Sequence, residues 1–463
     1  MRKVATLCLL GCASLSAQQI PPPTDLPGDP FFIKKTWPVN SSIDSVSAIL
    51  VDPVQSHLFL AYRQSVVVDD LQTGAALGSV GGSSGAFGIA LDDTGDFGFI
   101  SDGRYNQLDV FDRRTYQTVG ILPTAPNPTY VVFEPESALI FVVCNEPIVA
   151  NEPITQKTRA PWPPVDPPMS PWSRSDIPPP PSYPPRRPAR PPTNAKPATN
   201  PEGKWLLTVI DANNWKALAD ILLPSKVGFA QTAGNGHVYL GFPGRNELAR
   251  LDASALGEKL RRDTKNAHDA KDKPATPERT PKEEQLIFEH LPIPGRQWQH
   301  SPAQVLDWSN DQITARNEER QITLFRLNRE CGEPRALAAD ERHLRLFLAC
   351  ANKKLAVLNA DNGDLVTTLP TGPDTNAVAY DFDRRLVYAA NAGGYGSLTI
   401  IRQDVADFYA VVQNLPTPIW ARALTVNPVT GQIYLITDYT DSDSQQRIAK
   451  VEKGTFQLLL IGH

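Results

Sequence analysis

After its first residues, this chain of 463 amino acids has no apolar run long enough to cross a lipid bilayer. It also has no excess of positive charge, since the formal net charge is −5 and the pI is about 5.9. A global basic field that attracts nucleic-acid phosphates is therefore missing. The sequence predicts no transmembrane segment and no nucleic-acid partner.

Groups that could hold a metal ion are also missing. The seven histidines are scattered, and none forms a His-x-His or His-x-x-x-His pair. The acidic segment 438–443 lacks the regular aspartate spacing and the glycine of a calcium-binding loop. We therefore expect neither a metal site nor a cofactor.

What the chain does contain is a repeat, in which a short apolar strand with an aromatic anchor recurs along most of its length. The anchors are Phe59, Phe99, Phe141, Tyr239, Phe347, Tyr388 and Tyr434. Where copies follow one another without an insertion, the period is about 40 to 46 residues, which is typical of the four-stranded blades of a β-propeller. The sequence predicts an all-β fold, a seven-bladed β-propeller, with eight blades as the alternative.

Three long insertions interrupt this period. Residues 147–202 are rich in proline, which lacks the amide donor that a sheet needs, so we expect an extended or disordered segment. Residues 255–284 are a charged run, expected to form a loop or a frayed helix. Residues 295–330 hold either the extra strands of an eighth blade or an insertion at the corner before blade five, and we favour the corner.

Strand direction assigns these insertions to the two faces of the ring. In a four-stranded blade, the connection into the innermost strand and the loop between the second and third strands share one face. We therefore expect residues 147–202 and 295–330 on one face and residues 255–284 on the other. The face with two insertions is the predicted functional face.

Polar and aromatic loop residues of that face are candidate ligand-binding residues, because loops on a rigid scaffold commonly carry binding groups. Solvated loop residues without a role are the alternative at each position. The candidates are Arg104, Tyr105, Asn106, Arg245, Asn246, Asn391, Tyr395, Trp420, Arg422 and Asp438.

No catalytic residue is predicted. Residues 81–85 match the Gly-x-Ser-x-Gly pattern of serine hydrolases, but that motif works on a sharp strand-to-helix turn. Here strands are expected on both sides, so a flexible corner between two blades is the better interpretation. The sequence leaves open whether the chain is an enzyme and favours a non-enzyme.

The N-terminus is typical of an export signal. Arg2 and Lys3 precede an apolar stretch that ends in small residues near Ala17. We predict a signal peptide at 1–17, a linker at 18–30 and the propeller at 31–463, closed by pairing of residues 31–38 with the last blade. Residues 9–12 also resemble a lipoprotein cleavage box, so a lipid anchor on Cys12 is an alternative.

Three cysteines remain after removal of this signal, namely Cys144, Cys331 and Cys350. Export would permit a disulfide bond. Counting outward from the turn near residues 340–343 brings Cys331 and Cys350 opposite each other, at a separation that a bridge needs. The sequence predicts either this disulfide or two buried thiols, with Cys144 unpaired in both cases.

Residues 427–435 (NPVTGQIYL) and 385–391 (RLVYAAN) resemble the repeats of the YVTN-type β-propeller family, which are exported seven-bladed proteins. The resemblance implies an exported bacterial protein. We expect a non-catalytic, monomeric scaffold that binds a protein, a glycan or a small ligand on the face with the insertions. By analogy with other seven-bladed propellers, the alternatives are a lactonase-like or other hydrolase with its site in the central channel, or a partner subunit of a periplasmic dehydrogenase.

Overall fold

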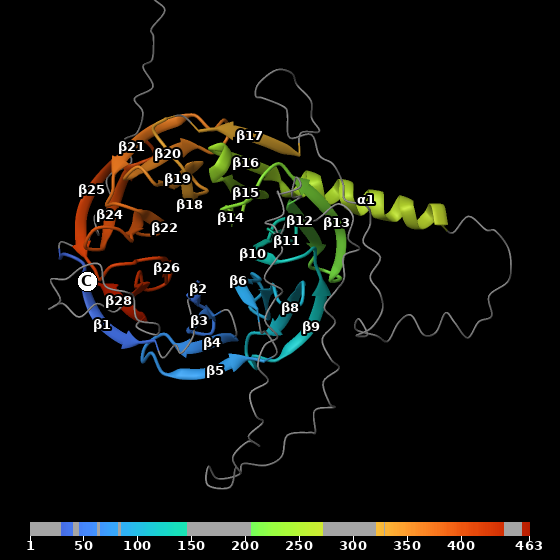
Figure 1. Cartoon of the computed structure of the whole chain (residues 1–463), viewed down its shortest axis with the longest axis horizontal. Helices are drawn as coiled ribbons and strands as arrows, with labels where there is room; N and C mark the ends of the chain where they lie inside the picture. Colours follow the sequence, from blue (N-terminus) through green and yellow to red (C-terminus); the bar gives the residue numbers. More distant parts are fainter. Residues whose placement is uncertain are drawn as a thin grey trace, which may run out of the picture.

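The computed structural model describes residues 29–39, 46–62, 65–81, 85–145, 205–271, 321–327, 329–438 and 456–463. Its strands form seven four-stranded antiparallel sheets around one axis, which confirms the predicted seven-bladed β-propeller (Figure 1). Among these residues, no helix is long and apolar enough to cross a membrane.

Each blade is a meander whose first strand lies nearest the axis. Blade one consists of β2 (Val46–Asp52), β3 (His57–Tyr62), β4 (Ser65–Asp70) and β5 (Ala76–Val80). Blade two consists of β6 (Ala86–Leu91), β7 (Phe97–Asp102), β8 (Gln107–Asp112) and β9 (Thr118–Pro123). Blade three consists of β10 (Pro128–Glu134), β11 (Leu139–Cys144), β12 (Trp205–Asp211) and β13 (Lys216–Leu223).

The remaining blades have the same strand order, except that the fourth strand of blade seven comes from the N-terminal side of the chain. Blade four consists of β14 (Phe229–Thr232), β15 (His237–Phe242), β16 (Glu247–Asp252) and β17 (Ile322–Arg326). Blade five consists of β18 (Pro334–Asp340), β19 (Arg345–Cys350), β20 (Lys354–Asn359) and β21 (Leu365–Pro370). Blade six consists of β22 (Thr375–Asp381), β23 (Leu386–Asn391), β24 (Ser397–Val405) and β25 (Phe408–Pro416). Blade seven consists of β26 (Ala423–Val426), β27 (Ile433–Asp438), β28 (Phe456–Gly462) and β1 (Phe32–Pro38).

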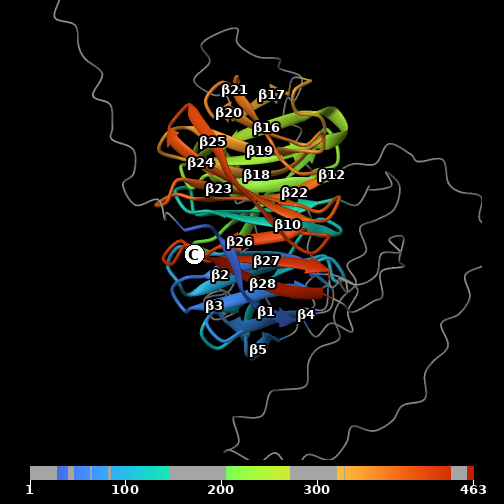
Figure 2. The same cartoon turned by 90° about the vertical axis from the view of Figure 1, so that its left-hand side faces the viewer.

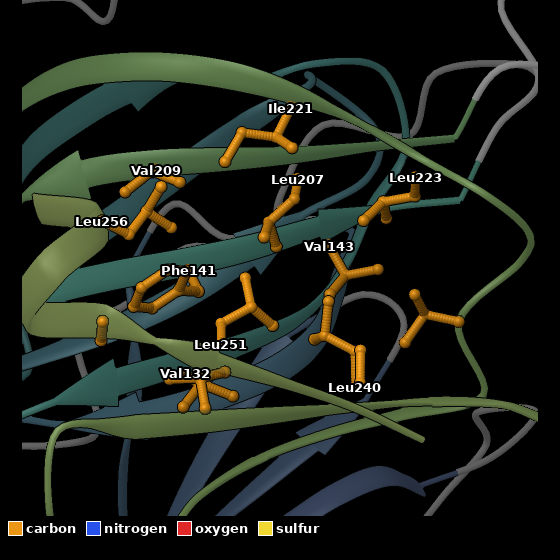
Figure 3. Close-up of a cluster of buried hydrophobic side chains, with 14 of the residues drawn as sticks. Val132, Phe141, Val143, Leu207, Val209, Ile221, Leu223, Leu240, Leu251 and Leu256 are labelled. Carbon is orange, nitrogen blue, oxygen red and sulfur yellow. The ribbon is translucent and has the colours of Figure 1, made fainter. Parts of the chain in front are cut away.

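The seven aromatic anchors all lie on the second strand of a blade, and each is at most 2% exposed. They are buried because neighbouring blades stack face to face and cover both sides of each sheet. Figure 3 shows one such contact, where Phe141 and Val143 of blade three pack with Leu240 and Leu251 of blade four. The repeat in the sequence is therefore a repeat of the core.

The ring closes in blade seven, where β1 from the N-terminal side pairs with β28 (Figure 1). Trp37 lies opposite Leu458 in this register, and the Val39 amide donates to the Phe456 carbonyl over 2.9 Å. The strand expected near residues 31–38 thus pairs with the last blade and forms its outer edge. Strand β28 is the third strand of blade seven and β1 is the fourth. The backbone hydrogen bonds between them therefore close the ring.

The structure differs from the sequence-based expectation in the region 255–330. Strand β17 pairs with β16, Leu248 lying opposite Phe325, and so completes blade four. The charged run begins as helix α1 (Ala253–Lys271), and residues 272–320 lie outside the described residues. The two predicted insertions are therefore one connection between the third and fourth strands of blade four, because β17 follows the insertion and returns to β16.

Helix α1 is held to the ring by its first turns. The Ala255 amide donates to Asp252 Oδ1 over 2.9 Å, which caps the helix. Leu256 and Leu260 join the core between blades three and four. Arg261 donates to Asp211 Oδ2 over 2.8 Å, and Figure 1 shows the rest of α1 projecting outward from the ring.

Two junctions between blades place an aromatic ring of one outer strand against a glycine of the next blade. A Cβ atom at Gly74 would lie 2.4 Å from the Trp37 ring, and one at Gly363 would lie 2.5 Å from Phe325 Cγ. Both glycines occupy the same position in the turn between third and fourth strands and have positive φ angles, 69° and 75°. Only glycine combines that conformation with so close an approach.

At two other junctions the positions are reversed, with the aromatic ring in the turn and the glycine on the outer strand of the preceding blade. Tyr116 and Trp215 occupy the same turn position in blades two and three, with φ angles of 60° and 55°. A Cβ atom at Gly78 of β5 would lie 3.2 Å from the Tyr116 ring, and one at Gly120 of β9 would lie 3.0 Å from the Trp215 ring. Each of the four junctions thus pairs one aromatic ring with one glycine. The total side-chain volume at the contact is therefore similar in all four.

Cys331 and Cys350 are joined by a disulfide bond with a Cα–Cα distance of 5.2 Å, whereas Cys144 is buried as a free thiol. The sequence had left the disulfide and two thiols as alternatives. The bond joins the connection before β18 to the end of β19, across a sequence separation of 19 residues.

Removal of this disulfide is expected to lower the free energy of unfolding by about 3 kcal/mol, because the bond restricts the unfolded chain. The double variant Cys331→Ala/Cys350→Ala and the parent protein can be compared by urea unfolding with and without reductant. The two midpoints should differ without reductant and converge with it. Equal midpoints without reductant would contradict the prediction.

Asp69 of β4 is a partly buried carboxylate, and burial raises its pKa from 3.8 to about 6. Ionisation of Asp69 therefore disfavours the folded state above pH 6, and this penalty disappears as the pH falls through 6 towards 4. Asp69→Asn should stabilise the protein at pH 7.5 by about 1 kcal/mol, since solvent screens part of the penalty. Urea midpoints at pH 7.5 and 4.5 test this, and a difference independent of pH would refute it.

Candidate functional site

The two ends of the ring carry different connections. The end with the connections between blades and the turns between second and third strands is here called the crossing face. The opposite end, with the other turns of each blade, is called the hairpin face. Figure 2 shows the ring from the side, with the strands of blade seven running between these faces. The connection that contains residues 147–202 joins β11 to β12 at the crossing face, whereas α1 follows β16 at the hairpin face.

The expectation that two insertions share one face is therefore corrected. The ten candidate binding residues nevertheless all lie at the crossing face. Six lie in turns between second and third strands, namely Arg104, Tyr105, Asn106, Arg245, Asn246 and Tyr395. The other four are Asn391 and Asp438 at strand ends, and Trp420 and Arg422 before β26.

Asn391 is a structural residue. Its side chain is fully buried and accepts a hydrogen bond from Thr375 Oγ1 over 2.8 Å. Its amide donates to Ser397 Oγ over 3.0 Å and to Thr399 Oγ1 over 2.9 Å. These bonds hold three strands of blade six together, so Asn391 is not exposed to a ligand.

Asn106 and Asn246 hold the turns in which they lie. Their φ angles of 55° and 54° are in the left-handed region, which asparagine adopts more readily than most residues. The Asn106 carbonyl accepts the Thr124 amide over 3.0 Å, and the Asn246 carbonyl accepts the Leu327 amide over 3.1 Å. Each turn is thereby tied to the connection that leaves the same blade.

Trp420 and Arg422 form a pair on the connection into blade seven. The Arg422 guanidinium lies 4.3 Å from the centre of the Trp420 ring, within the range of a cation–π contact. Trp420 has a φ angle of 64°, which is unusual for a bulky residue, and its amide donates to the Ala392 carbonyl over 3.0 Å. Tyr395 lies in the turn tied to Trp420 and is 74% exposed.

The remaining candidates are spread around the ring. The Arg104 guanidinium lies 5.6 Å from the centre of the Tyr105 ring in blade two. Arg245 in blade four donates to Glu247 Oε2 over 2.6 Å. Asp438 pairs through its backbone with Phe456 of β28. Arg104 and Arg245 thus share the crossing face with Trp420 but belong to blades two and four.

A feature that was not predicted from the sequence lies where the inner strands begin. In blades one, two, three, five and six, a bulge shifts the register between the first and second strands at the crossing-face end. Bulges redirect side chains and are frequent beside binding sites. The residues that the bulges add are Ser47, Phe87, Gly88, Thr129, Arg335 and Asn376.

Polar bulge residues join neighbouring blades around the axis. Ser47 donates to the Ala86 carbonyl of blade two over 3.2 Å. The Thr129 carbonyl accepts from Ser101 Oγ of blade two over 2.6 Å, and its hydroxyl accepts from Asn145 Nδ2 over 3.0 Å. We call Ser47, Thr129, Arg335 and Asn376 the axial rim.

Arg335 is the charged member of the axial rim. It donates to Asn376 Oδ1 over 2.8 Å and to Asp374 Oδ1, both from blade six. Glu333 Oε1 lies 3.6 Å from its other terminal nitrogen. These contacts hold the Arg335 side chain, which is 29% exposed and so remains partly open to solvent.

Solved structures of other proteins resemble this chain in fold. No family model and no curated protein matches the chain. It is similar to the solved structure of U3-55K, with a TM-score of 0.54 and 8% identity over 92% of this chain and 98% of that one. It is also similar to the Cps50 (Swd1) β-propeller domain of Myceliophteria thermophila, with a TM-score of 0.52 and 11% identity over 94% and 100%.

A further similar structure is that of the WD40 repeats of RRP9, with a TM-score of 0.55 and 8% identity over 92% of this chain and 97% of that one. The chain is a β-propeller with WD40-type structural neighbours. At these identities the likeness shows the fold alone.

The chemistry of this propeller's axial rim suits binding. It combines guanidinium, amide and hydroxyl donors with the carboxylate of Asp374. Within the described ranges, no three histidine, cysteine or acidic side chains are grouped so that they could hold a metal ion. The buried thiol of Cys144 has its pKa raised, first by burial and then by the Asp220 carboxylate, so it is protonated at neutral pH.

The two faces of the propeller carry opposite excesses of charge in their described connections, outside α1. On the crossing face, six cations face three carboxylates, namely Arg104, Lys226, Arg245, Arg329, Lys353 and Arg422 against Glu330, Glu333 and Asp374. On the hairpin face the carboxylates are in excess, namely Asp92, Asp93, Asp96, Glu136, Glu341, Asp361, Asp364, Asp383 and Asp407 against Arg113, Arg114, Arg342, Arg384 and Arg385. The crossing face therefore favours anionic ligands although the chain is acidic.

Proposed function

We propose that this chain is an exported, non-catalytic β-propeller that binds a ligand at its crossing face, around the axial rim. The ligand is a protein, a glycan or a small molecule. The observation that carries the proposal is the ring of bulges, because five inner strands depart from regular pairing at the same end of the axis. Four of the residues added there are polar and fixed by hydrogen bonds between blades.

A binding screen of the purified protein on glycan and peptide arrays tests the proposal. Ligands found in this way should bind Arg335→Ala/Asn376→Ala at least about tenfold more weakly, because two fixed polar contacts are lost. Arg114→Ala is the matched control, since its side chain is 66% exposed on the hairpin face and pairs with Asp96. Equal loss of binding in both variants would place the site elsewhere.

Two observations support export. The N-terminal residues have the pattern of a signal peptide, and the Cys331–Cys350 disulfide suits an oxidising compartment. The repeats at 385–391 and 427–435 also fit membership of the YVTN-type family of exported bacterial propellers. Fractionation of producing cells, with labelling by fatty acid of the parent and of Cys12→Ser, would distinguish a released protein from a lipid-anchored one. Recovery of the full-length chain from the cytoplasm would contradict export.

The alternative function is that of a hydrolase with its site near the axis, and it is tested separately. A screen of lactones and esters with added divalent ions measures it directly. Turnover that disappears in Arg335→Ala but not in Arg114→Ala would replace the binding proposal by the enzymatic one.

A further inference from the structure

We propose that the crossing face of blades five to seven binds an acidic polysaccharide, that is, a chain of sugars that carry carboxylates. This inference rests on the proposed binding function and names its ligand class. The surface concerned comprises Arg335, Asp374, Tyr395, Trp420 and Arg422 and is called the glycan surface below.

The glycan surface is continuous, because three connections are tied together. Arg335 of blade five is bonded to Asp374 on the connection into blade six. A Cβ atom at Gly393 would lie 3.0 Å from Asp374 Cβ, so the turn that carries Tyr395 packs directly on this connection. The Trp420 amide bonded to the Ala392 carbonyl then joins the same turn to the connection into blade seven.

Two aromatic rings on this surface suit the apolar face of a sugar ring. Tyr395 is 74% exposed and stands between Gly394 and Gly396. The turn is nevertheless held, since a Cβ atom at Gly396 would lie 2.2 Å from the Pro418 carbonyl oxygen. An exposed ring on a held turn offers a flat apolar surface at a low cost in backbone conformational entropy. Trp420, held by Arg422, is the second ring.

The polar groups decide between a polysaccharide and an acidic peptide. Arg335 and Arg422 can bind carboxylates, and the cation excess of the crossing face attracts any polyanion. Asp374 and Glu333, however, are acceptors beside Arg335. The hydroxyls of an acidic polysaccharide can donate to these carboxylates. Ionised acidic side chains have no such donor, and their carboxylates, like those of the sugars, are repelled by Asp374 and Glu333. The combination of the exposed Tyr395 ring, the half-buried Trp420 ring, two arginines and acceptor carboxylates therefore favours the polysaccharide.

Three polymers with matched properties test this inference with the whole protein. Polygalacturonate carries a carboxylate on each sugar, polyglutamate carries the same charge without sugar rings, and dextran has sugar rings without charge. Biolayer interferometry at 150 mM salt should show polygalacturonate binding at least about tenfold more tightly than the other two. Tyr395→Ala and Arg422→Ala should each weaken that binding by about fivefold or more.

Control variants come from exposed apolar residues away from the glycan surface. Val429 on the hairpin face is 72% exposed and Phe408 at the start of β25 is 69% exposed, so Val429→Ala and Phe408→Ala should leave binding unchanged. Thermal melting of each variant checks that it is folded, and Trp420→Phe, which keeps a ring, should bind better than Trp420→Ala.

The inference is overturned if polygalacturonate does not bind, if polyglutamate or dextran binds equally well, or if Tyr395→Ala has no effect. Its failure can be separated from failure of the proposed function. If an array ligand of another class binds and depends on Arg335 and Asn376, binding at the axial rim is supported and only the polysaccharide is refuted.

Discussion

Replacement of Arg113 by methionine will destabilise the propeller by about 3 to 5 kcal/mol, because the change leaves buried carboxylates without their cation. Arg113 follows β8 in blade two and is 2% exposed. It donates to both oxygens of Asp52 in blade one, from Nε over 2.9 Å and from Nη2 over 2.5 Å. Its Nη1 donates to the Asp92 carbonyl over 3.0 Å and to Asp92 Oδ1 over 3.2 Å.

The carboxylate of Asp52 is fully buried, so it cannot recover solvation by water when the guanidinium is removed. Urea unfolding of Arg113→Met measures the loss. The adjacent residue supplies the control, since Arg114 is 66% exposed and pairs with the exposed Asp96 over 3.0 Å. Arg114→Met should cost at most about 0.5 kcal/mol. Adding Asp52→Asn to Arg113→Met should recover stability, and equal losses in the two single variants would contradict the argument.

Replacement of Gly363 by alanine is expected to cost about 3 kcal/mol, from backbone strain together with overpacking. The φ angle of Gly363 is 75°, and the new Cβ atom would lie 2.5 Å from Phe325 Cγ, at the junction of blades four and five. Both the turn and the ring of β17 must then move, which separates two blades at their outer contact.

Three further variants identify the cause of that loss. Gly81→Ala is the control, because no atom of the described residues beyond its chain neighbours lies within 4 Å of its Cβ position and its φ angle is not in the left-handed region. It should change stability by at most about 0.5 kcal/mol. Phe325→Leu should be less costly in the Gly363→Ala background than in the parent, because a smaller side chain relieves the clash. Thermal melting of the parent, Gly363→Ala, Phe325→Leu and the double variant gives the comparison. Additive effects of the two changes would exclude a clash.

The blades could be predicted from the sequence because they depend on local pattern. Each anchor, from Phe59 to Tyr434, occupies the same place in its blade, and burial between two sheets requires an apolar residue there. The pairing of the segment near residues 31–38 with the last blade could also be predicted, since a closed ring leaves one strand place to fill. The proximity of Cys331 to Cys350 follows from the same strand pattern, although the residue paired with Cys350 in the sheet is Pro334.

The candidate site was predicted less completely. The order of the strands within a blade places all ten candidates at the crossing face. That order does not show which of their side chains are buried or hydrogen-bonded. Asn391 is enclosed by Thr375 and Thr399, and Asn106 is committed to its turn. Arg335 was missed because a bulge depends on the register between two strands, and a single strand contains no sign of it. The small or polar residue at the start of several inner strands, as in Ser47 and Thr129, is the weak signal that could have indicated the rim.

The sequence alone determined the kind of fold and favoured seven blades over eight, because the stacking of apolar sheets imposes a period that can be read along the chain. The count of seven was settled by the strand pairing, in which β17 completes blade four. The tertiary structure decided which strand completes each blade and therefore which face each insertion occupies. Strand β17 shows why, since residues 272–320 separate it from α1 and only its hydrogen bonds to β16 assign it to blade four. The rim likewise exists only when blades meet, because its hydrogen bonds join residues that are distant in sequence.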